Sequence, residues 1–312
     1  MSAGQTMTAD AIVVTWRSGE RVLGCLERLA DQLQPGRTFV VDNGSGDGTV
    51  AAVRASFPSV RVLELPENRG FGAAVNAGAA LGDGEAIVLV NDDVEIEQGF
   101  VDAIVAPLQA DGRCAMVAGM TMIPDSGRVD AFGIELDVTL AAYNRLRRRP
   151  PQESPGRLAM PSGGAAAYRR SAFERAGGFD ERLHAYGEDV DLGLRLLLDG
   201  WSAGAAPEAR GTHLGGATIG VDSPLQRELG GFARGFLLRR YGVLRTRACA
   251  RALLFEALVV GWGLVAHRTT VPLRARMRGW RAGAGERLPI PAQAIDRTIT
   301  AREAFWRLRH AR

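Results

Sequence analysis

Short apolar runs rich in β-branched residues alternate with longer amphipathic stretches along the first half of this chain. The short runs predict buried strands at residues 11–15, 38–41, 60–65, 86–90 and 115–118. Apolar residues at helical spacing between them predict helices at residues 19–33, 49–57, 72–81 and 98–111. This alternation predicts an α/β fold whose mostly parallel central sheet is flanked by helices.

The pattern is less regular further along the chain. Residues 145–157 are rich in Arg and Pro and offer little to bury, so we expect a mobile loop there. A helix is predicted to open near Glu188 and a strand to cover residues 202–206, with His213 in the loop that follows.

The charge of the chain is unevenly divided. Residues 1–226 carry a net charge of −10 and residues 227–312 a net charge of +13, within a total of +3. We expect the first range to form the main domain and the second to form a basic, amphipathic helical appendage. A basic appendage after an acidic body indicates an anionic partner, either a membrane surface or nucleic acid.

The apolar run at residues 252–266 is shorter than the roughly 20 residues that a membrane-spanning helix needs. With arginines on both sides, it predicts interfacial helices on an anionic membrane. The alternative is a core helix that packs on the main domain or, in a homodimer, on a second subunit.

The first ten residues lack a basic segment followed by an apolar stretch, so no cleaved secretory signal is expected. The protein is therefore predicted to be cytoplasmic, with a peripheral place on the inner face of the membrane as an option. Cys25, Cys114 and Cys249 are odd in number and far apart, which argues against disulfides and a zinc site. We expect them to be small buried hydrophobic residues.

The predicted strand at residues 86–90 ends in Asn91, Asp92 and Asp93. Ligands of open α/β sheets bind beyond the carboxyl ends of the strands. Two adjacent carboxylates there suit Mg²⁺ or Mn²⁺, hard cations that take oxygen ligands and leave positions for substrate phosphates. The alternative is an acidic turn without a ligand, since Asp and Asn are common turn residues.

Two other strand ends lead into polar, glycine-containing turns. Asp42 follows one strand and is placed to accept a hydrogen bond from the N–H of a pyrimidine base, unless it only shapes the turn. Asn68, Arg69 and Gly70 precede a helix whose N-terminus suits a diphosphate, with Arg69 as a charged fork. The alternative there is close packing of the helix on the sheet.

Candidate groups recur between residues 161 and 216. Gly163 and Gly164 allow a ligand to approach the backbone closely. Glu188 and Asp189 open a helix, where one of them can face a cleft as a general base, although acids in a first turn also stabilise helices. His213 is a candidate imidazole ligand for the metal, with a structural role as the alternative.

The order of these segments closely resembles family 2 glycosyltransferases of the GT-A fold. The subgroup that it resembles most is the bacterial rhamnosyltransferases of cell-wall and O-antigen assembly. The resemblance covers residues 11–216 and is carried by residues 13–16 (VVTW), 41–49 (VDNGSGDGT), 68–72 (NRGFG), 91–93 (NDD) and 187–192 (GEDVDL).

The resemblance implies inverting transfer of a sugar from a nucleotide-diphosphate donor. The best candidate is L-rhamnose from dTDP-rhamnose, moved onto a hydroxyl of a cell-envelope glycan or a polyprenyl-diphosphate-linked acceptor. Thr15 would lie against the nucleoside, and Asp42 would bind the base. Asp189 corresponds to the catalytic base, with Glu188 beside it.

The resemblance also implies a metal that bridges the diphosphate, Mg²⁺ or Mn²⁺. Asp93 and His213 would be its ligands, and Asp92 is a lesser candidate. One departure from the family pattern is Asn91, which stands where an Asp is usual and adds no charge.

Two alternatives to this function remain at the level of the sequence. One is a transferase that uses a UDP-sugar, and the other is a catalytically idle GT-A module that binds a nucleotide or a membrane. A nucleic-acid partner is not expected, because the aromatic residues near the arginines lack a regular stacking pattern.

Overall fold

The structure is a computed structural model that describes residues 7–215 and 223–310. Residues 1–6, and Gly216 at the end of the family resemblance, lie outside this description. The first eleven elements include all nine predicted strands and helices, and the structure adds the short strands β5 and β7. They are β1 (Ala9–Thr15), α1 (Arg21–Ala30), β2 (Thr38–Asp42), α2 (Thr49–Ser56), β3 (Arg61–Glu64), α3 (Phe71–Ala79), β4 (Ala86–Val90), β5 (Val94–Ile96), α4 (Phe100–Ala110), β6 (Cys114–Met122) and β7 (Val129–Ala131).

The second half of the chain returns to the sheet with long strands and ends in helices. Its elements are β8 (Ile134–Leu136), β9 (Ala142–Asn144), β10 (Ala165–Arg169), α5 (Arg170–Arg175), α6 (Glu188–Leu198), β11 (Ser202–His213), α7 (Pro224–Arg240), the short 3₁₀ helix η1 (Val243–Arg245), α8 (Cys249–Ala266), α9 (Val271–Ala282), the 3₁₀ helix η2 (Ala292–Ala294) and α10 (Ala301–His310).

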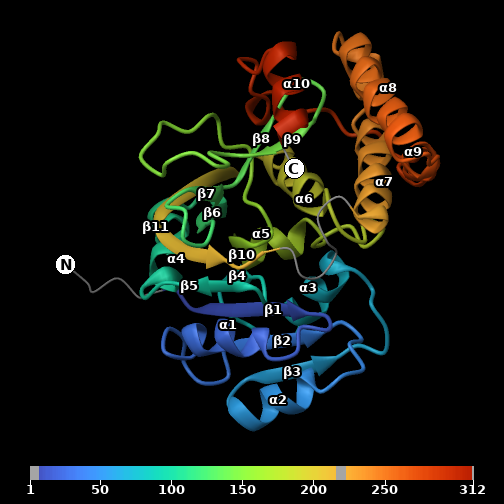
Figure 1. Ribbon diagram of the computed structural model, residues 1–312. Helices are drawn as coiled ribbons and strands as arrows, with labels where there is room; N and C mark the ends of the chain where they lie inside the picture. Colours follow the sequence, from blue (N-terminus) through green and yellow to red (C-terminus); the bar gives the residue numbers. More distant parts are fainter. Residues whose placement is uncertain (1–6, 216–222, 311–312) are drawn as a thin grey trace.

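The central sheet is mixed. Its strand order is β3-β2-β1-β4-β10-β6-β11-β5, with β7 paired to β6 (Figure 1). The strands β3, β2, β1 and β4 run parallel, as the sequence predicts for this part. β10 runs antiparallel to both β4 and β6, and it joins this parallel half to the pair formed by β6 and β11.

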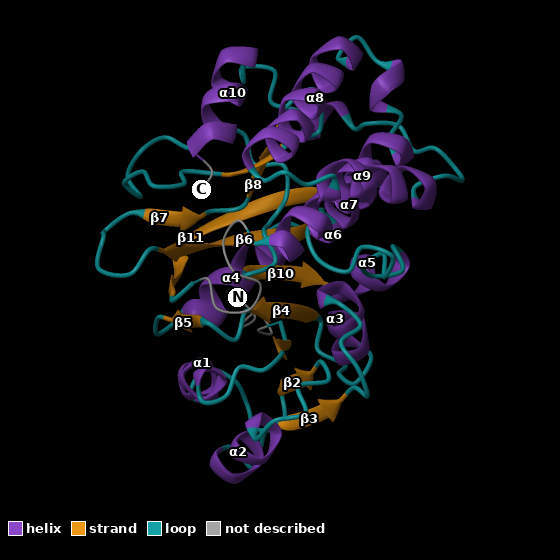
Figure 2. Ribbon diagram, turned by 45° about the vertical axis from the view of Figure 1, so that its right-hand side comes forward, coloured by secondary structure: helices purple, strands orange, loops and turns teal. Residues whose placement is uncertain are grey.

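Helices cover both faces of the sheet (Figure 2). The helices α1, α2 and α4 pack on one face, while α3, α5 and α6 pack on the other. Adjacent residues of β1 point to opposite faces, so that Ile12 joins the core on the α3 side whereas Ala11 and Val13 join the core on the α1 side. Because both faces are buried, the central strands are continuous apolar runs.

The C-terminal helices pack beside α6, at the top and right of Figure 1. α7 and α9 pack closely through glycines: a Cβ atom at Gly235 would overlap the Arg276 carbonyl, and one at Gly279 would overlap the Phe232 carbonyl. The predicted domain boundary at residue 226 falls near the start of α7, and the division into two domains stays a prediction.

Some local expectations differ from the structure. Residues 145–157 form a loop with residues 152–157 exposed, but Arg145 is buried and its guanidinium lies over the Phe132 ring; the mobility of this loop stays a prediction. His213 is not in a loop but is the last residue of β11, which is longer than predicted. The apolar helix is also longer, because α8 begins at Cys249. Cys25 and Cys114 are buried as expected, whereas Cys249 is only half-buried.

The carboxylate of Asp191 connects α6 to α7. Its side chain is fully buried and lies 2.7 Å from Arg195 Nε and 2.9 Å from Arg240 Nε. The Tyr241 hydroxyl donates a third bond to it at 2.9 Å. A buried charge is tolerated only when it is paired and hydrogen-bonded. These contacts therefore fix the first turn of α6 against the C-terminal helices.

We expect Asp191→Ala to lower the free energy of unfolding by about 3–5 kcal/mol, because it leaves buried guanidinium charge without its partner. Urea denaturation followed by circular dichroism measures this loss. The matched control is Arg54→Ala, which breaks an exposed pair with Glu64 and should cost about 1 kcal/mol or less. Equal costs for the two variants would contradict this account of Asp191.

Candidate functional site

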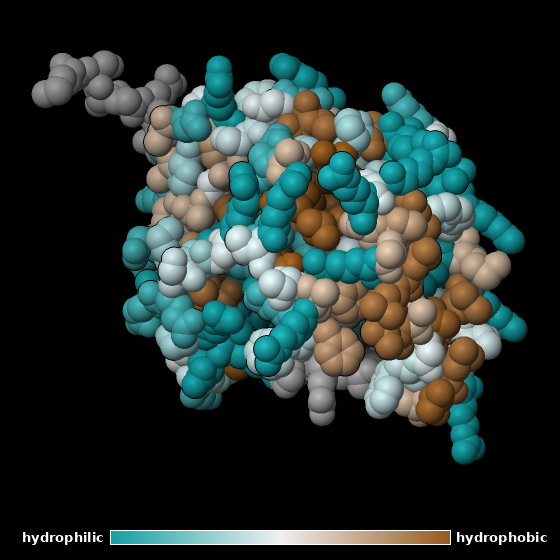
Figure 3. Space-filling view, turned by 90° about the horizontal axis from the view of Figure 1, so that it is seen from above, coloured by the Kyte–Doolittle hydropathy of each residue, from teal (hydrophilic) through white to brown (hydrophobic). Residues whose placement is uncertain are grey.

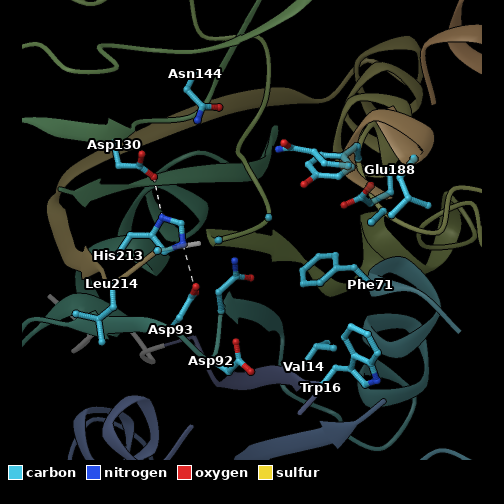
Figure 4. A pocket seen from close by; sticks show the side chains of 18 of the residues that line it. Val14, Trp16, Phe71, Asp92, Asp93, Asp130, Asn144, Glu188, His213 and Leu214 are labelled. Atoms are coloured by element: carbon cyan, nitrogen blue, oxygen red, sulfur yellow. Dashed lines mark hydrogen bonds and ion pairs between the residues drawn. The ribbon is translucent and has the colours of Figure 1, made fainter. Parts of the chain in front are cut away.

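A cavity of about 830 Å³ lies at the end of the sheet where β1 and β4 finish. Side chains from separate elements converge on it (Figure 4). The predicted site residues in its walls are Asn68, Gly70, Asn91, Asp92, Asp93, Gly163, Gly164, Glu188 and His213. The sequence therefore identified residues that the fold brings together from segments far apart in the chain.

Asp93, His213 and Asp130 form a chain of polar contacts on one side of the cavity. His213 Nε2 lies 3.3 Å from Asp93 Oδ1, and Nδ1 lies 2.8 Å from Asp130 Oδ2 (Figure 4). The two carboxylates, Asp130 first and Asp93 second, raise the pKa of His213 to about 10. The ring is thus held between two acids and lines the cavity.

These residues fit a divalent cation in part. Metal ligands at neighbouring coordination positions lie about 3 Å apart when each is about 2.1 Å from the ion, close to the Asp93–His213 separation. Asp93 Oδ1 is buried, and its 3.3 Å contact with His213 Nε2 is an ion pair that does not have hydrogen-bond geometry. Asp130 contacts the other ring nitrogen, where it can orient a ligating imidazole. Among residues 7–215 and 223–310, no group of three or more His, Cys, Asp or Glu side chains could hold a metal. Further ligands would therefore come from a substrate.

Asp92 has a different environment from Asp93. It is buried, and this burial raises the pKa of its carboxyl, while contacts with the Ser18 and Thr15 hydroxyls oppose the shift. Thr15 is itself buried, and it is the neighbouring Val14 and Trp16 that line the cavity. Asp92 and Thr15 thus support the cavity floor, and their predicted contact with a nucleotide stays a prediction.

Glu188 lies on the opposite side of the cavity from Asp93 (Figure 4). It begins α6 together with Asp189, which does not line the cavity. Gly187 precedes them in the left-handed region at φ 82°, which turns the chain into the helix. Glu188 is 7% exposed and lines the cavity, with Oε2 left without a hydrogen-bond partner. Asp189 is half-buried, and its Oδ1 accepts a bond from the Val190 N–H at 2.8 Å.

The two acids differ in how readily they ionise. Burial raises the pKa of both carboxyls, and the charge of Asp189 raises the pKa of Glu188 further. Hydrogen bonds from the backbone N–H groups of Val190 and Gly163 oppose the rise for Asp189. These hydrogen bonds favour the ionised form of Asp189, whereas the charge of Asp189 favours the neutral form of Glu188.

The turn after β2 supplies a second set of polar atoms. Asp42 is 4% exposed, with Oδ2 accepting from the Ser45 N–H at 3.1 Å and Oδ1 lacking a hydrogen-bond partner. Asp42 does not line the cavity, so its predicted contact with a base stays a prediction. A buried acceptor without a partner is costly, and a donor from a ligand would satisfy it.

The loop before α3 is fixed by its backbone. Gly70 has φ 92°, and a Cβ there would overlap the His184 backbone. The N–H of Phe71 donates to the His184 carbonyl at 2.8 Å. Arg69 points away to an exposed ion pair with Glu181 at 2.9 Å, so its predicted contact with a diphosphate stays a prediction.

Comparison with known proteins places these features in a family. The sequence profile described as glycosyl transferase family 2 matches residues 10–177. The chain belongs to this family. As a glycosyltransferase it is 32% identical over 249 residues to N-acetylglucosaminyl-diphospho-decaprenol L-rhamnosyltransferase of Mycobacterium tuberculosis (strain ATCC 25618 / H37Rv), over 70% of this chain and 79% of that protein.

Solved structures show the fold of this glycosyltransferase. The mannosyltransferase PcManGT from Pyrobaculum calidifontis, in complex with GDP-Man and Mn²⁺, matches with a TM-score of 0.57 and 19% identity, over 98% of this chain and 81% of that one. GalNAc-T7 with UDP, GalNAc and Mn²⁺ matches with a TM-score of 0.59 and 14% identity, over 76% of this chain and 48% of that one. The predicted GT-A fold is confirmed.

Several residues of the glycosyltransferase cavity were not identified from the sequence. Asp130 comes from β7, a strand of three residues without a recognisable motif. Arg147 and Arg148 line the cavity from the stretch expected to be a mobile loop, and Arg147 lies 3.5 Å from Asp130. Tyr186 has φ 68°, unusual for a residue with a side chain, and it lies just before the two acids of α6. The one sequence feature that could have identified Tyr186 is its position next to Gly187, at the turn into α6.

We expect Asp130→Asn to weaken Mn²⁺ binding by about 10–100-fold, because the amide no longer holds the imidazole as a charged acceptor does. Isothermal titration with Mn²⁺ in the presence of a nucleoside diphosphate measures the affinity. The control is Asp125→Asn, which changes an exposed acid of the preceding loop. An unchanged affinity in Asp130→Asn would show that Asp130 does not support a metal ligand.

Proposed function

We propose that this protein is an inverting transferase that moves L-rhamnose from dTDP-rhamnose onto a hydroxyl of a polyprenyl-diphosphate-linked glycan. The reaction would take place at the cytoplasmic face of the cell membrane. The observation that carries the proposal is the opposition of two polar groups across one cavity. The Asp93–His213 pair lies on one side and Glu188 on the other, with Asp189 next to Glu188 at the start of α6, although Asp189 itself does not line the cavity.

The donor would occupy the side formed by β1, β4 and β11. Asp93 and His213 would hold Mg²⁺ or Mn²⁺, which when bound offsets the negative charge that develops on the leaving diphosphate. The free Asp42 Oδ1 is an acceptor for a base N–H. The cavity wall between the Asp93–His213 pair and Asp42 offers further polar atoms and accessible backbone, from Asn68, Asn91, Gly163 and Gly164.

The acceptor hydroxyl would lie on the α6 side. Asp189 ionises first, so at neutral pH it is the carboxylate able to take the hydroxyl proton as the oxygen attacks the anomeric carbon. Glu188 stays protonated beside it and can donate a hydrogen bond to the acceptor. Direct attack on the face opposite the leaving diphosphate inverts the configuration at that carbon.

The sugar and the acceptor rest on the rhamnosyltransferase relative. That protein is named for transfer of L-rhamnose to N-acetylglucosaminyl-diphospho-decaprenol. Arg147 and Arg148 in the cavity wall supply positive charge that suits an acceptor bearing a diphosphate.

The direct test is to incubate the protein with dTDP-rhamnose, UDP-sugars or GDP-sugars, a lipid-linked acceptor and Mn²⁺, and to follow release of the nucleotide. We expect Asp189→Asn to slow transfer by about 10²–10⁴-fold, because the amide cannot accept the proton. Glu188→Gln should cost about tenfold or less, since it keeps a hydrogen-bond donor. The base would be reassigned if Glu188→Gln were the more damaging change. Consumption of a UDP-sugar alone would replace the donor, and consumption of no donor would support a binding module.

The pH dependence gives an independent check on the base. Because burial raises the pKa of Asp189, the acid limb of kcat/KM should lie above the ordinary carboxyl range of about pH 4. Activity is then lost as pH falls through this raised pKa and is retained above it. Glu188→Gln should leave the limb in place, since Asp189 ionises while its neighbour is still neutral. A limb that moves or disappears in Glu188→Gln would assign the titration to Glu188.

A further inference from the structure

The helix α8 presents an apolar face to solvent. Among the described residues it is the one helix long and apolar enough to cross a membrane by length and composition, with a mean hydropathy of 1.7, yet only 17% of its residues are buried. Its exposed large side chains, with their exposed fractions, are Leu253 (51%), Leu254 (58%), Leu258 (43%), Trp262 (54%), Leu264 (45%) and Val265 (80%). Positions 254, 258, 262 and 265 follow one another at helical spacing, so they form a continuous stripe.

The opposite side of α8 is tied to the protein. Glu256 Oε1 lies 2.6 Å from Arg234 Nε of α7, and its Oε2 lies 2.6 Å from Arg276 Nε of α9. Phe255 and Gly263 are buried on the same side. A spanning helix would have to break both ion pairs and carry Glu256 into hydrocarbon, which is costly. The geometry instead suits a helix that lies along an interface with one face on the protein.

A second feature borders α8 at its N-terminal end. Arg239, Arg245 and Arg287 surround a hollow of about 190 Å³, together with Trp280. Arg239 lies over the Trp280 ring at 5.1 Å. No ion pair joins these three arginines to a carboxylate within the described residues 7–215 and 223–310. Arg245 belongs to η1, which packs on α8, so the hollow and the apolar stripe belong to neighbouring elements.

An apolar face of this kind can be covered by a second copy of the chain or by a membrane, and the charge around it distinguishes the two. Exposed arginines surround the stripe on both sides in the sequence, at positions 245, 247, 268, 274, 278, 281 and 287. Figure 3 shows hydrophobic side chains on the face seen from above, with hydrophilic side chains between and beside them. A second copy would bring the same arginines against one another across a twofold interface, which is unfavourable. An anionic lipid surface complements both the arginines and the apolar stripe.

We propose that α8 is a membrane-docking helix, whose stripe of Leu254, Leu258, Trp262 and Val265 enters the acyl boundary of an anionic membrane. The hollow formed by Arg239, Arg245 and Arg287 receives the phosphate of a lipid headgroup. This inference rests on the proposed function only for its purpose, which is to bring the cavity to a lipid-linked acceptor. The docking itself follows from the helix and its charges.

Vesicle sedimentation tests the docking without any sugar donor. The full-length protein should bind vesicles that contain phosphatidylglycerol. Its binding to pure phosphatidylcholine vesicles should be weaker by about tenfold or more. The double variant Leu254→Ser, Leu258→Ser should reduce binding to the anionic vesicles by about tenfold or more. The double variant retains Trp262. On vesicle addition, the fluorescence emission of Trp262 should shift to the blue in the parent protein but not in the double variant. The difference between the spectra of the parent and the Trp262→Phe variant gives the contribution of Trp262.

The arginine hollow has its own matched pair of variants. Arg245→Gln with Arg287→Gln should reduce binding to the anionic vesicles by about tenfold or more. Arg28→Gln with Arg113→Gln removes the same charge from exposed positions elsewhere and should leave binding unchanged. If both double variants lost vesicle binding equally, the effect would come from net charge in general, and the role proposed for the hollow would be wrong.

Two results would overturn the docking proposal. One is equal vesicle binding by the parent and the Leu254→Ser, Leu258→Ser variant. The other is a dimer in light scattering that this variant abolishes, which would make a second copy the occupant. Failure of the proposed function is seen separately, because vesicle binding needs no donor and nucleotide release needs no vesicle when the acceptor is short and water-soluble. Thermal unfolding of each variant confirms that it is folded.

Discussion

The buried Asp191 carboxylate is the contact on which the arrangement of this protein depends. It stands two residues after Asp189 and receives Arg195 from its own helix, and Arg240 and Tyr241 from the end of α7. The first turn of α6 is therefore positioned by the C-terminal helices as well as by the sheet. A chain lacking those helices would leave Asp191 with Arg195 alone, next to the two acids that begin α6.

The cavity itself follows from how the sheet is built. Parallel strands end on the same side, so the parallel arrangement alone brings the residues after β1, β2 and β4 to one edge of the sheet. The antiparallel β10 then brings Gly163 and Gly164 to that edge, because its N-terminal end lies beside the C-terminal end of β4. β11 runs parallel to β6 and places His213 next to Asp93. The family resemblance and the fold agree because both reflect this geometry.

The sequence was sufficient for the parallel half, and nine of the thirteen predicted site residues line the cavity, since apolar runs and strand-end motifs are local signals. It failed where the decisive contact is distant in the chain. The sequence around Asp130 contains no motif that would identify it. Asp130 reaches the cavity only because β7 pairs with β6. The burial of Arg145 was missed for a similar reason, because its guanidinium lies over the aromatic ring of Phe132. Composition cannot report a partner of that kind.

The contact between Gly70 and His184 has a further consequence. The loop before α3 and the segment that leads to α6 share a backbone hydrogen bond, at a point where no side chain fits. The two halves of the cavity are thereby coupled mechanically before any substrate arrives. Less reorganisation is then needed to hold Glu188 opposite Asp93 and His213, and a single added methyl group at position 70 would separate them.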